Sequence, residues 1–221
     1  MKTAEAAAIR IENLALRFEG RSVLENLSLA LPEGGRVTLT GPSGSGKSSV
    51  LRCVMGFAVP ASGNVFVRGE RVTGHSVWKL RTQLAYVAQE PVLAAGTLRE
   101  EFERPFEYRA NHGARGNLEK LPELLERFLL PQELLDQDVV RLSGGEKQRA
   151  AIVSALLLDR RIFLMDEPAS ALDTAARDAV LEFFRERTDL SVLVVSHAPQ
   201  GFDLGGRAIA LPERARAGGA G

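Results

Sequence analysis

GPSGSGKS, the sequence of residues 41–48, decides the fold class of this chain. It fits the pattern G-x-x-x-x-G-K-[ST] at every position, with the β-rich run 37–40 directly before it and a helix-like apolar run to about Gly56 directly after it. A strand, a glycine-rich loop and a helix in this order are the setting of a P-loop, whose backbone N–H groups surround phosphates. The motif predicts that Lys47 reaches the β- and γ-phosphates and that Ser48 binds Mg²⁺. The predicted nucleotide-binding residues of this stretch are Gly41, Pro42, Ser43, Gly44, Ser45, Gly46, Lys47, Ser48 and Ser49.

A second glycine motif follows later in the chain, in the stretch Leu142-Ser143-Gly144-Gly145-Glu146. Ser143 and Glu146 have the spacing of a capping box, with two glycines between them. Both motifs predict a helix start that presents unpaired N–H groups and the positive end of a helix dipole to an anion. Because one nucleotide needs only one P-loop, the second helix start must serve another purpose. Its predicted binding residues are Ser143, Gly144, Gly145 and Glu146.

The composition suits one large domain, or one domain with an insertion. The chain has 221 residues, of which 45% are hydrophobic, enough for a sizeable core. It carries 28 basic and 28 acidic residues, so no overall charge draws it toward nucleic acid. The single cysteine, Cys53, excludes an internal disulfide, and its place in the helix after the P-loop favours a small buried role over redox chemistry.

The chain carries no sequence signal for a membrane or for secretion. No apolar run approaches the ~20 residues that span a bilayer. Residues 1–8 lack the basic-then-apolar pattern of a signal peptide. We therefore expect a cytoplasmic protein, and any membrane part of its function must come from another chain.

The apolar pattern predicts two kinds of strand. Alternating apolar residues in 9–19 and 22–31 indicate antiparallel strands, and 65–67 and 84–88 are further short strands. Continuous apolar runs at 162–165 and 192–195, separated by helical stretches, indicate a parallel sheet that is covered on both faces. The predicted fold is therefore an α/β fold with a mainly parallel core sheet and an antiparallel β layer near the N-terminus.

A helical insertion is expected between these strands. Leucines and a phenylalanine recur at helical spacing through residues 118–129, and the pattern stays helical from Pro91 to about Leu158. Within it, the polar, glycine-containing stretch 109–116 predicts a loop. The Ala-, Gly- and Arg-rich tail 213–221 is predicted to be disordered.

Two carboxylates follow the apolar run 162–165. Asp166 is placed to hold Mg²⁺, usually through water, and Glu167 is the candidate base that orients or deprotonates a water. Acidic residues at strand ends often serve only solvation. The P-loop upstream favours the catalytic interpretation here.

Gln89 and His197 also follow predicted strands. A glutamine at such a place is commonly a solvated loop residue, and a single histidine is more often structural than catalytic. His197, however, follows the buried run 192–195, so it should lie at the carboxyl edge of the sheet, where ligands bind in open α/β folds. There a neutral imidazole could hydrogen-bond a γ-phosphate or an attacking water.

Together and in this order, these residues resemble the ATP-binding cassette (ABC) ATPase family, from about Ile9 to Leu211. Residues 41–48 are similar to its Walker A motif, 142–146 to its signature, and 162–167 to its Walker B motif with the catalytic glutamate. The resemblance implies that Gln89 is the Q-loop glutamine, with a role toward nucleotide and Mg²⁺. It further implies that Asp173 belongs to the D-loop and that His197 is the switch histidine.

The resemblance also implies a purpose for the second glycine motif. In this family, ATP on the Walker A motif of one subunit is covered by the signature helix of a second subunit. We therefore expect a head-to-tail homodimer that closes on two ATP molecules with Mg²⁺, in which Glu167, His197 and Lys47 act in hydrolysis. Phe18 occupies the position of the family's adenine-stacking aromatic residue, although it could instead be a core residue of its strand.

The resemblance implies one ABC ATPase domain over residues 1–221. Its RecA-like core and antiparallel β layer are expected at about 9–90 and 159–212, and its helical subdomain at about 91–158.

Segments after Gln89 and before the signature resemble the small bacterial cassettes of the FetA/YbbL type, which partner a separate permease in metal (iron) export. This implies an integral membrane permease as partner, a place on the cytoplasmic face of the inner membrane, and no direct nucleic-acid binding. Phe102, Phe106 and Tyr108 could contact the permease or pack inside the helical insertion. Two alternatives are a soluble ABC ATPase acting on nucleic acid or ribosomes, and a P-loop kinase, which the signature disfavours.

Overall fold

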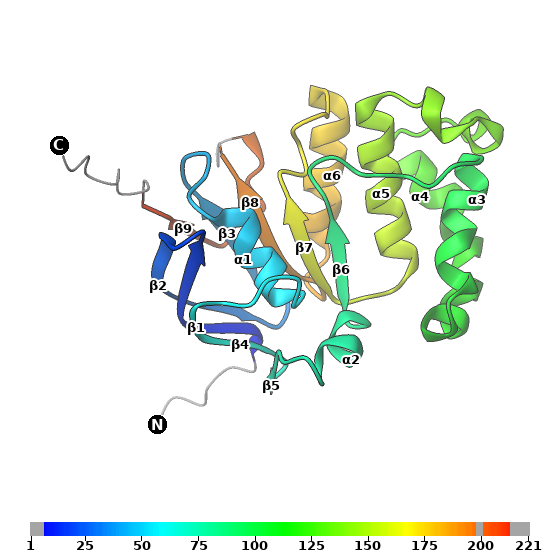
Figure 1. Cartoon of the computed structure of the whole chain (residues 1–221). Coiled ribbons are helices and arrows are strands. Elements are labelled where there is room, and N and C mark those ends of the chain that lie inside the picture. Colours follow the sequence, from blue (N-terminus) through cyan, green and yellow to red (C-terminus); the bar gives the residue numbers. More distant parts are fainter. Residues whose placement is uncertain (1–6, 198–200, 213–221) are drawn as a thin grey trace.

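The computed structural model describes residues 7–197 and 201–212, so the tail 213–221, predicted to be disordered, lies outside the described residues. Two sheets form its framework (Figure 1). The strands are β1 (Ala7–Phe18), β2 (Arg21–Pro32), β3 (Arg36–Thr40), β4 (Ser62–Val67), β5 (Glu70–Arg71), β6 (Leu84–Val87), β7 (Ile162–Asp166), β8 (Ser191–Ser196) and β9 (Arg207–Ala210). The α-helices are α1 (Lys47–Val54), α2 (Val77–Arg81), α3 (Leu98–Glu103), α4 (Leu121–Arg127), α5 (Gly144–Leu157) and α6 (Thr174–Glu186). The 3₁₀ helices are η1 (Arg104–Glu107), η2 (Arg109–Lys120), η3 (Gln132–Asp136) and η4 (Val139–Arg141).

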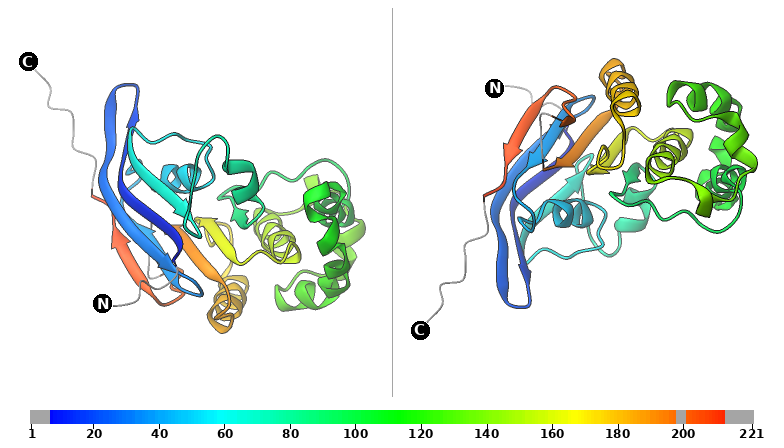
Figure 2. Two further views of the ribbon diagram at one scale, coloured as in Figure 1. Left: turned by 90° about the horizontal axis from the view of Figure 1, so that it is seen from below. Right: turned by 90° about the horizontal axis from the view of Figure 1, so that it is seen from above.

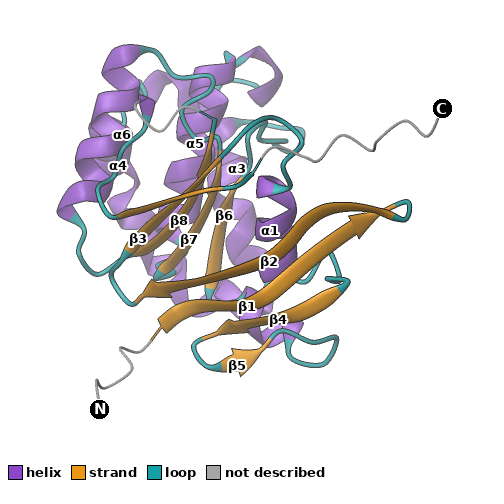
Figure 3. Ribbon diagram, turned by 90° about the vertical axis from the view of Figure 1, so that its left-hand side faces the viewer, coloured by secondary structure: helices purple, strands orange, loops and turns teal. Residues whose placement is uncertain are grey.

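The predicted α/β fold class is confirmed. A parallel sheet has the order β6-β7-β8-β3-β9, and an antiparallel sheet has the order β2-β1-β4-β5. Figure 3 shows the long strands β1 and β2 crossing beside α1 and the parallel strands. The carboxyl ends of the parallel strands lie at one edge of their sheet, where a ligand site is expected.

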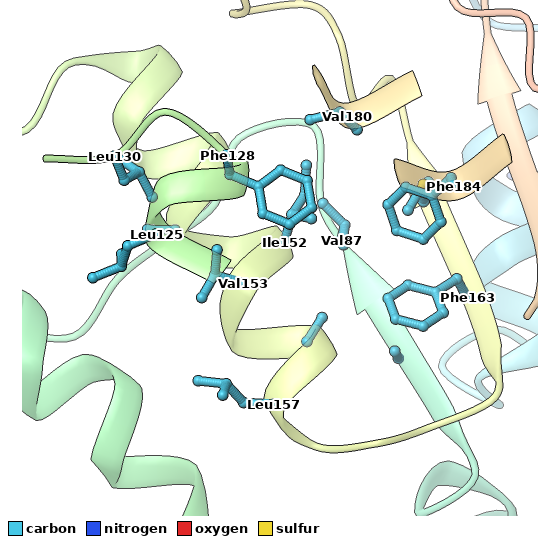
Figure 4. Close-up of a cluster of buried hydrophobic side chains, with 14 of the residues drawn as sticks. Val87, Leu125, Phe128, Leu130, Ile152, Val153, Leu157, Phe163, Val180 and Phe184 are labelled. Atoms are coloured by element: carbon cyan, nitrogen blue, oxygen red, sulfur yellow. The ribbon is translucent and has the colours of Figure 1, made fainter. Parts of the chain in front are cut away.

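Side chains alternate along the parallel strands between two hydrophobic clusters. Phe163 and Met165 of β7 pack with α5 and α6, whereas Ile162 and Leu164 pack with α1 and the antiparallel sheet. Figure 4 shows the first cluster, in which the ring of Phe163 lies 5.2 Å from that of Phe184 at 70°. Burial on both faces explains the continuous apolar run, because each successive side chain meets a different covering layer.

The helical insertion is built mainly from short helices. Figure 2 shows this part of the chain, coloured green, at the end of the molecule away from the antiparallel sheet. The loop predicted for residues 109–116 is wrong, because η2 spans Arg109–Lys120. Two asparagine side chains fix the turns of η2 through hydrogen bonds to residues outside it. Asn111 donates to the carbonyl of Pro105 at 2.8 Å, and Asn117 donates to the carbonyl of Leu157 at 3.0 Å.

The two phenylalanines considered for a permease contact pack inside the insertion. Phe102 and Phe106 are 0% and 1% exposed and belong to the cluster around α5. Burying such a ring stabilises the fold by about 1.5–3 kcal/mol. Of the three candidates, only Tyr108 lies on the surface.

Candidate nucleotide-binding site

The P-loop, Asp166, Glu167 and His197 meet because of strand register. β3 leads into the P-loop and pairs with β8 through Thr40 and Ser196, directly before His197. β8 in turn pairs with β7, with Val195 opposite Asp166. Segments far apart in the sequence therefore end side by side at the carboxyl edge of the parallel sheet.

Glycines allow the backbone of the P-loop to take its course. Gly46, at the N-cap of α1, has φ 93°, and Gly44 has φ 78°. Both values lie in the left-handed region, which is strained for other residues. A Cβ on Gly41 would lie 2.8 Å from the carbonyl oxygen of Leu211, so this glycine also permits a close backbone approach.

A cleft of about 370 Å³ lies over the start of α1. Gln89, Glu167 and His197, three of the predicted site residues, line it together with residues of the P-loop. A larger cavity of about 620 Å³ is lined by residues of α1, β4 and the loops beside them. Among the described residues, Arg71 is its one charged lining residue, so the smaller cleft fits a polyphosphate better. The cleft is lined by Val23, Ser43, Gly44, Gly46, Lys47, Ser48, Ser49, Gln89, Glu167 and His197.

Lys47 lies at the centre of this cleft with its ammonium group held by three acceptors. Its Nζ donates to the carbonyls of Gly41 at 2.9 Å and Pro42 at 2.8 Å, and lies 3.3 Å from Nδ1 of His197. Burial lowers the pKa of Lys47, and the nearby carboxylates of Glu167 and Asp166 oppose that effect. Because the ammonium has only donors, Nδ1 of His197 is the acceptor and its Nε2 carries the proton.

Ser48 and Asp166 offer an oxygen pair that fits Mg²⁺. The Ser48 hydroxyl donates to Oδ1 of Asp166 at 2.9 Å. Within the described residues, no group of three or more His, Cys, Asp or Glu side chains gathers to hold a metal ion. A hydroxyl and one carboxylate are nevertheless the kind of donor set that Mg²⁺ takes when substrate phosphates supply further ligands.

Glu167 has a strained backbone and a buried carboxylate oxygen. Its φ is 49°, in the left-handed region, which costs about 1–3 kcal/mol for a residue of this type. The backbone holds this position because the Glu167 N–H donates to the carbonyl of Val195 at 2.9 Å. Oε1 lies 2.9 Å from Nε2 of His197 and is buried, and among the described residues it has no partner with hydrogen-bond geometry. Because Glu167 also lines the cleft, its carboxylate is placed to act on a molecule bound there.

The second glycine motif forms the start of α5, outside this cleft. Ser143 and Glu146 make a capping box: Oε2 of Glu146 accepts from the Ser143 N–H at 2.7 Å, and the Ser143 hydroxyl accepts from the Glu146 N–H. The bonds from Ser143 lower the pKa of the Glu146 carboxyl. A Cβ on Gly145 would lie 2.9 Å from the carbonyl oxygen of Ala171, so a side chain here would strain the packing of α5 on the loop before α6.

Comparisons with known proteins agree with this geometry. A family model described as ABC transporter matches residues 24–170, which is more than half of the chain and includes both glycine motifs and the pair Asp166-Glu167.

The chain belongs to the ABC transporter family.

Its relatives include ATP-binding proteins of both importers and exporters. The probable iron export ATP-binding protein FetA of Escherichia coli K12 is 32% identical over 197 residues, which are 86% of this chain and 84% of FetA. The molybdenum import ATP-binding protein ModC of Thiobacillus denitrificans is 38% identical and matches 90% of this chain and 55% of ModC. The Fe(3+) ions import ATP-binding protein FbpC of Photorhabdus laumondii is 32% identical and matches 86% of this chain and 54% of FbpC. The chain thus spans about half the length of these two import relatives.

Solved structures confirm the recognition as an ABC ATPase cassette. The dimeric structure of MJ0796, a bacterial ABC transporter cassette, has a TM-score of 0.81 and 28% sequence identity, and the match covers 92% of this chain and 94% of that one. No helix within the described parts of this ABC cassette has the length and apolar character needed to cross a membrane.

Some predicted site residues of the cassette lie apart from the cleft. Asp173 is the N-cap of α6, where its carboxylate accepts from the Ala176 N–H at 2.8 Å. Phe18 ends β1, and its role toward adenine stays a prediction. Sequence reasoning missed Val23, which lines the cleft from β2, because an apolar residue in a strand carries no signal beyond core packing.

Proposed function

We propose that this cassette binds ATP with Mg²⁺ in the cleft over α1 and hydrolyses it to power transport through a separate membrane permease. The observation that carries the proposal is the convergence of Lys47, Ser48 and the Glu167 carboxylate on one cleft, with Asp166 bonded to Ser48 behind it. A phosphate chain, a cation and an attacking water need these three kinds of group.

The proposed reaction is in-line attack of water on the γ-phosphorus. The backbone N–H groups of the P-loop and Lys47 neutralise phosphate charge. Glu167 orients the water and takes its proton while the new O–P bond forms and the bond to the β–γ bridging oxygen breaks, releasing ADP and phosphate. His197, protonated on Nε2, donates toward the developing negative charge. When bound, Mg²⁺ held by Ser48 and Asp166, with Gln89 nearby, would supply further charge neutralisation.

A head-to-tail homodimer is the proposed working form. The start of α5 is absent from the residues that line the cleft, so a signature contact to the γ-phosphate must come from a second copy. In that copy the N–H groups of Gly144 and Gly145, and the helix dipole, would face the phosphate. The dimeric bacterial cassette among the solved relatives supports this arrangement.

A groove beside β6 is the proposed docking site for the permease. It has a volume of about 270 Å³ and lies between the segment after Gln89 and α5, with Pro91, Val92 and Leu93 along one side. Val92 is 94% exposed, which suits an apolar contact with a cytoplasmic helix of the permease. The cassette would then act at the cytoplasmic face of the inner membrane.

Metal ions, with iron export as the specific case, are the proposed cargo. FetA is the relative that supports export, because the match spans most of both chains. The balanced charge of the chain gives no support to the alternative of a soluble protein acting on nucleic acid or ribosomes.

Two measurements test the proposal at separate levels. Purified protein should release phosphate from ATP only when Mg²⁺ is present, and a chain without this activity would refute the ATPase assignment. Cells that lack the protein, or carry only Glu167→Gln, should accumulate more iron than cells with the wild type. Equal iron in all three would refute iron export while leaving the ATPase assignment intact.

A further inference from the structure

An exposed patch of aromatic, aliphatic and basic side chains lies where the end of α1 meets α2. α2 buries Val77 and Leu80, whereas Trp78 between them is 72% exposed. Phe57 and Val59, in the loop after α1, are 64% and 92% exposed. Large apolar side chains with this much exposure add little to a core, so together they form a candidate contact surface.

Arg81 holds the two aromatic rings of this patch together. Its guanidinium carbon lies 4.0 Å from the ring centroid of Phe57 and 5.0 Å from that of Trp78. Its Nε donates to the carbonyl of Met55 at 2.8 Å, which ties α2 to the end of α1. The two elements pack closely, because a Cβ on Gly56 would lie 2.5 Å from a methyl carbon of α2. The patch is therefore preorganised, which lowers the entropic cost of binding a partner.

The same region carries an excess of positive charge. Residues 49–89 contain a single acidic residue, Glu70, although the whole chain has 28 basic and 28 acidic residues. Within the described chain, Glu70 pairs with Lys79 at 2.6 Å, whereas Arg71 and Arg81 form no ion pair with a carboxylate. Arg71 is exposed and lines the 620 Å³ cavity together with Val59, so its charge lies beside the apolar part of the patch. The basic residues of this stretch are Arg52, Arg68, Arg71, Lys79 and Arg81.

The patch lies beside the groove that is proposed for the permease. The carbonyl of Arg81 accepts a hydrogen bond from Nη1 of Arg160 at 3.2 Å, and Arg160 lines that groove. Figure 1 shows α2 at the amino end of β6, away from the carboxyl edge of the parallel sheet. A membrane contact at the patch would therefore leave the cleft over α1 open to nucleotide.

We propose that this patch binds the surface of a bilayer that contains anionic phospholipids. Tryptophan and phenylalanine rings settle at the level of the headgroups, and basic side chains are attracted to the negative surface. A protein partner would need a recess shaped for Trp78 and Phe57, whereas a bilayer accepts exposed rings without such a match. The inference goes beyond the proposed transport function, because it needs neither the permease nor ATP.

The chain carries one tryptophan, so its intrinsic fluorescence reports on this patch alone. Full-length protein without nucleotide is titrated with vesicles of phosphatidylglycerol and phosphatidylethanolamine, and separately with vesicles of phosphatidylcholine. We expect the Trp78 emission to shift to shorter wavelength with the anionic vesicles only, and co-sedimentation with them to weaken as the salt concentration rises. No shift, or an equal shift with both kinds of vesicle, would overturn the inference and leave the proposed function standing.

Matched variants separate the patch from the rest of the surface. Val59→Asp should abolish the shift, whereas Val140→Asp, at a valine of η4 that is 75% exposed, should keep it. Arg71→Gln should weaken binding to the anionic vesicles about fivefold, and Arg115→Gln, at an exposed arginine of η2, should match the wild type. All four variants should retain the wild-type circular dichroism spectrum.

Two results of these vesicle experiments would contradict a lipid contact. Equal vesicle binding by Val59→Asp and the wild type would show that the patch is not the contact. A Trp78 shift with inverted vesicles of the native membrane, but not with pure lipid, would assign the patch to a membrane protein instead.

Discussion

The helices that begin at the two glycine motifs start in opposite ways. α1 has Gly46 as its N-cap, with no side-chain hydrogen bond and no acidic residue in its first turn. α5 has Ser143 as its N-cap, a complete capping box and the carboxylate of Glu146 in its first turn. Every α-helix begins with N–H groups that lack a partner within the helix. α1 leaves them open, whereas the side chains at the start of α5 already satisfy part of its backbone.

This difference in capping favours phosphate binding within one chain at the start of α1 and phosphate contact across a dimer at the start of α5. An uncapped helix start behind a glycine loop can hold phosphates within one chain. The start of α5 carries a carboxylate whose pKa is lowered by its bonds to Ser143, so it is ionised at neutral pH and weakens the attraction for a free anion. We therefore expect the α5 start to contact phosphate only when a dimer brings it there with the N–H groups of its glycines.

The largest expected effect is at the open helix start. Lys47→Ala removes the ammonium that lies between the P-loop carbonyls and His197, and ATPase activity should fall about 10²–10³-fold or more. Phosphate release measures it. Lys79→Ala, at an exposed lysine paired with Glu70, is the control and should match the wild type. Comparable ATPase activity in the two variants would contradict the assignment of Lys47 to the nucleotide site.

The next largest effect is expected at the capped helix start. Gly145→Ala places a Cβ 2.9 Å from the Ala171 carbonyl, and overpacking of this kind costs about 1–3 kcal/mol. The strain should weaken ATP-dependent dimerisation at least about tenfold, while ATP binding by the monomer stays unchanged. Sedimentation in a Glu167→Gln background measures the dimer. Gly116→Ala, whose added Cβ would meet no atom of the described residues within 4 Å, should dimerise normally.

A smaller effect concerns the pH dependence of the α5 cap. The folded-state pKa of Glu146 is lowered, so its contribution to stability is present above the unfolded pKa of about 4.5 and is lost as the pH falls through the folded value. Glu146→Gln keeps an oxygen acceptor for the Ser143 N–H, so it should flatten this part of the acid dependence. Glu146→Ala should cost about 1 kcal/mol at pH 7. Urea unfolding at pH 7 and pH 4 tests both, and identical pH profiles in the wild type and Glu146→Gln would contradict the assignment.

The smallest expected effect concerns the reactivity of a thiol near the C-terminal end of α1. Cys53 is buried near the end of this helix, and burial raises its thiol pKa to about 11. Thiols at helix starts have lowered pKa values and react readily. Cys53 should therefore resist iodoacetamide at pH 8 in the native protein and react only after unfolding. Rapid native labelling, followed by mass spectrometry, would show that the helix opens there.

Much of the architecture follows from local patterns. Alternating and continuous apolar runs predicted both sheets, because one-sided and two-sided burial leave different signatures. Loop predictions were weaker: residues 109–116 form a 3₁₀ helix whose partners, Pro105 and Leu157, lie outside that stretch. Glycine and asparagine indicate turns, but they do not reveal which distant carbonyl an amide will reach.

The residues of the candidate site, like the elements of the fold, fall into those that sequence motifs predicted and those that only packing between elements brought in. The P-loop motif was enough to propose Lys47 and Ser48 as nucleotide-site residues, because phosphate chemistry requires those residue types at that spacing. Asp166 and Glu167 were proposed only in combination with that motif, since acidic residues at a strand end are weak evidence alone. Packing of the antiparallel sheet on the start of α1 brought Val23 to the cleft, and this contact leaves no trace within the segment of Val23 itself.

The residue pattern of the chain thus specifies the family and the P-loop chemistry. The capping-box spacing of Ser143 and Glu146 already indicated a capped start for α5. Only the tertiary structure decided that this helix start lies outside the cleft over α1, because the packing of α5 against the rest of the fold, and not its own residues, sets its position.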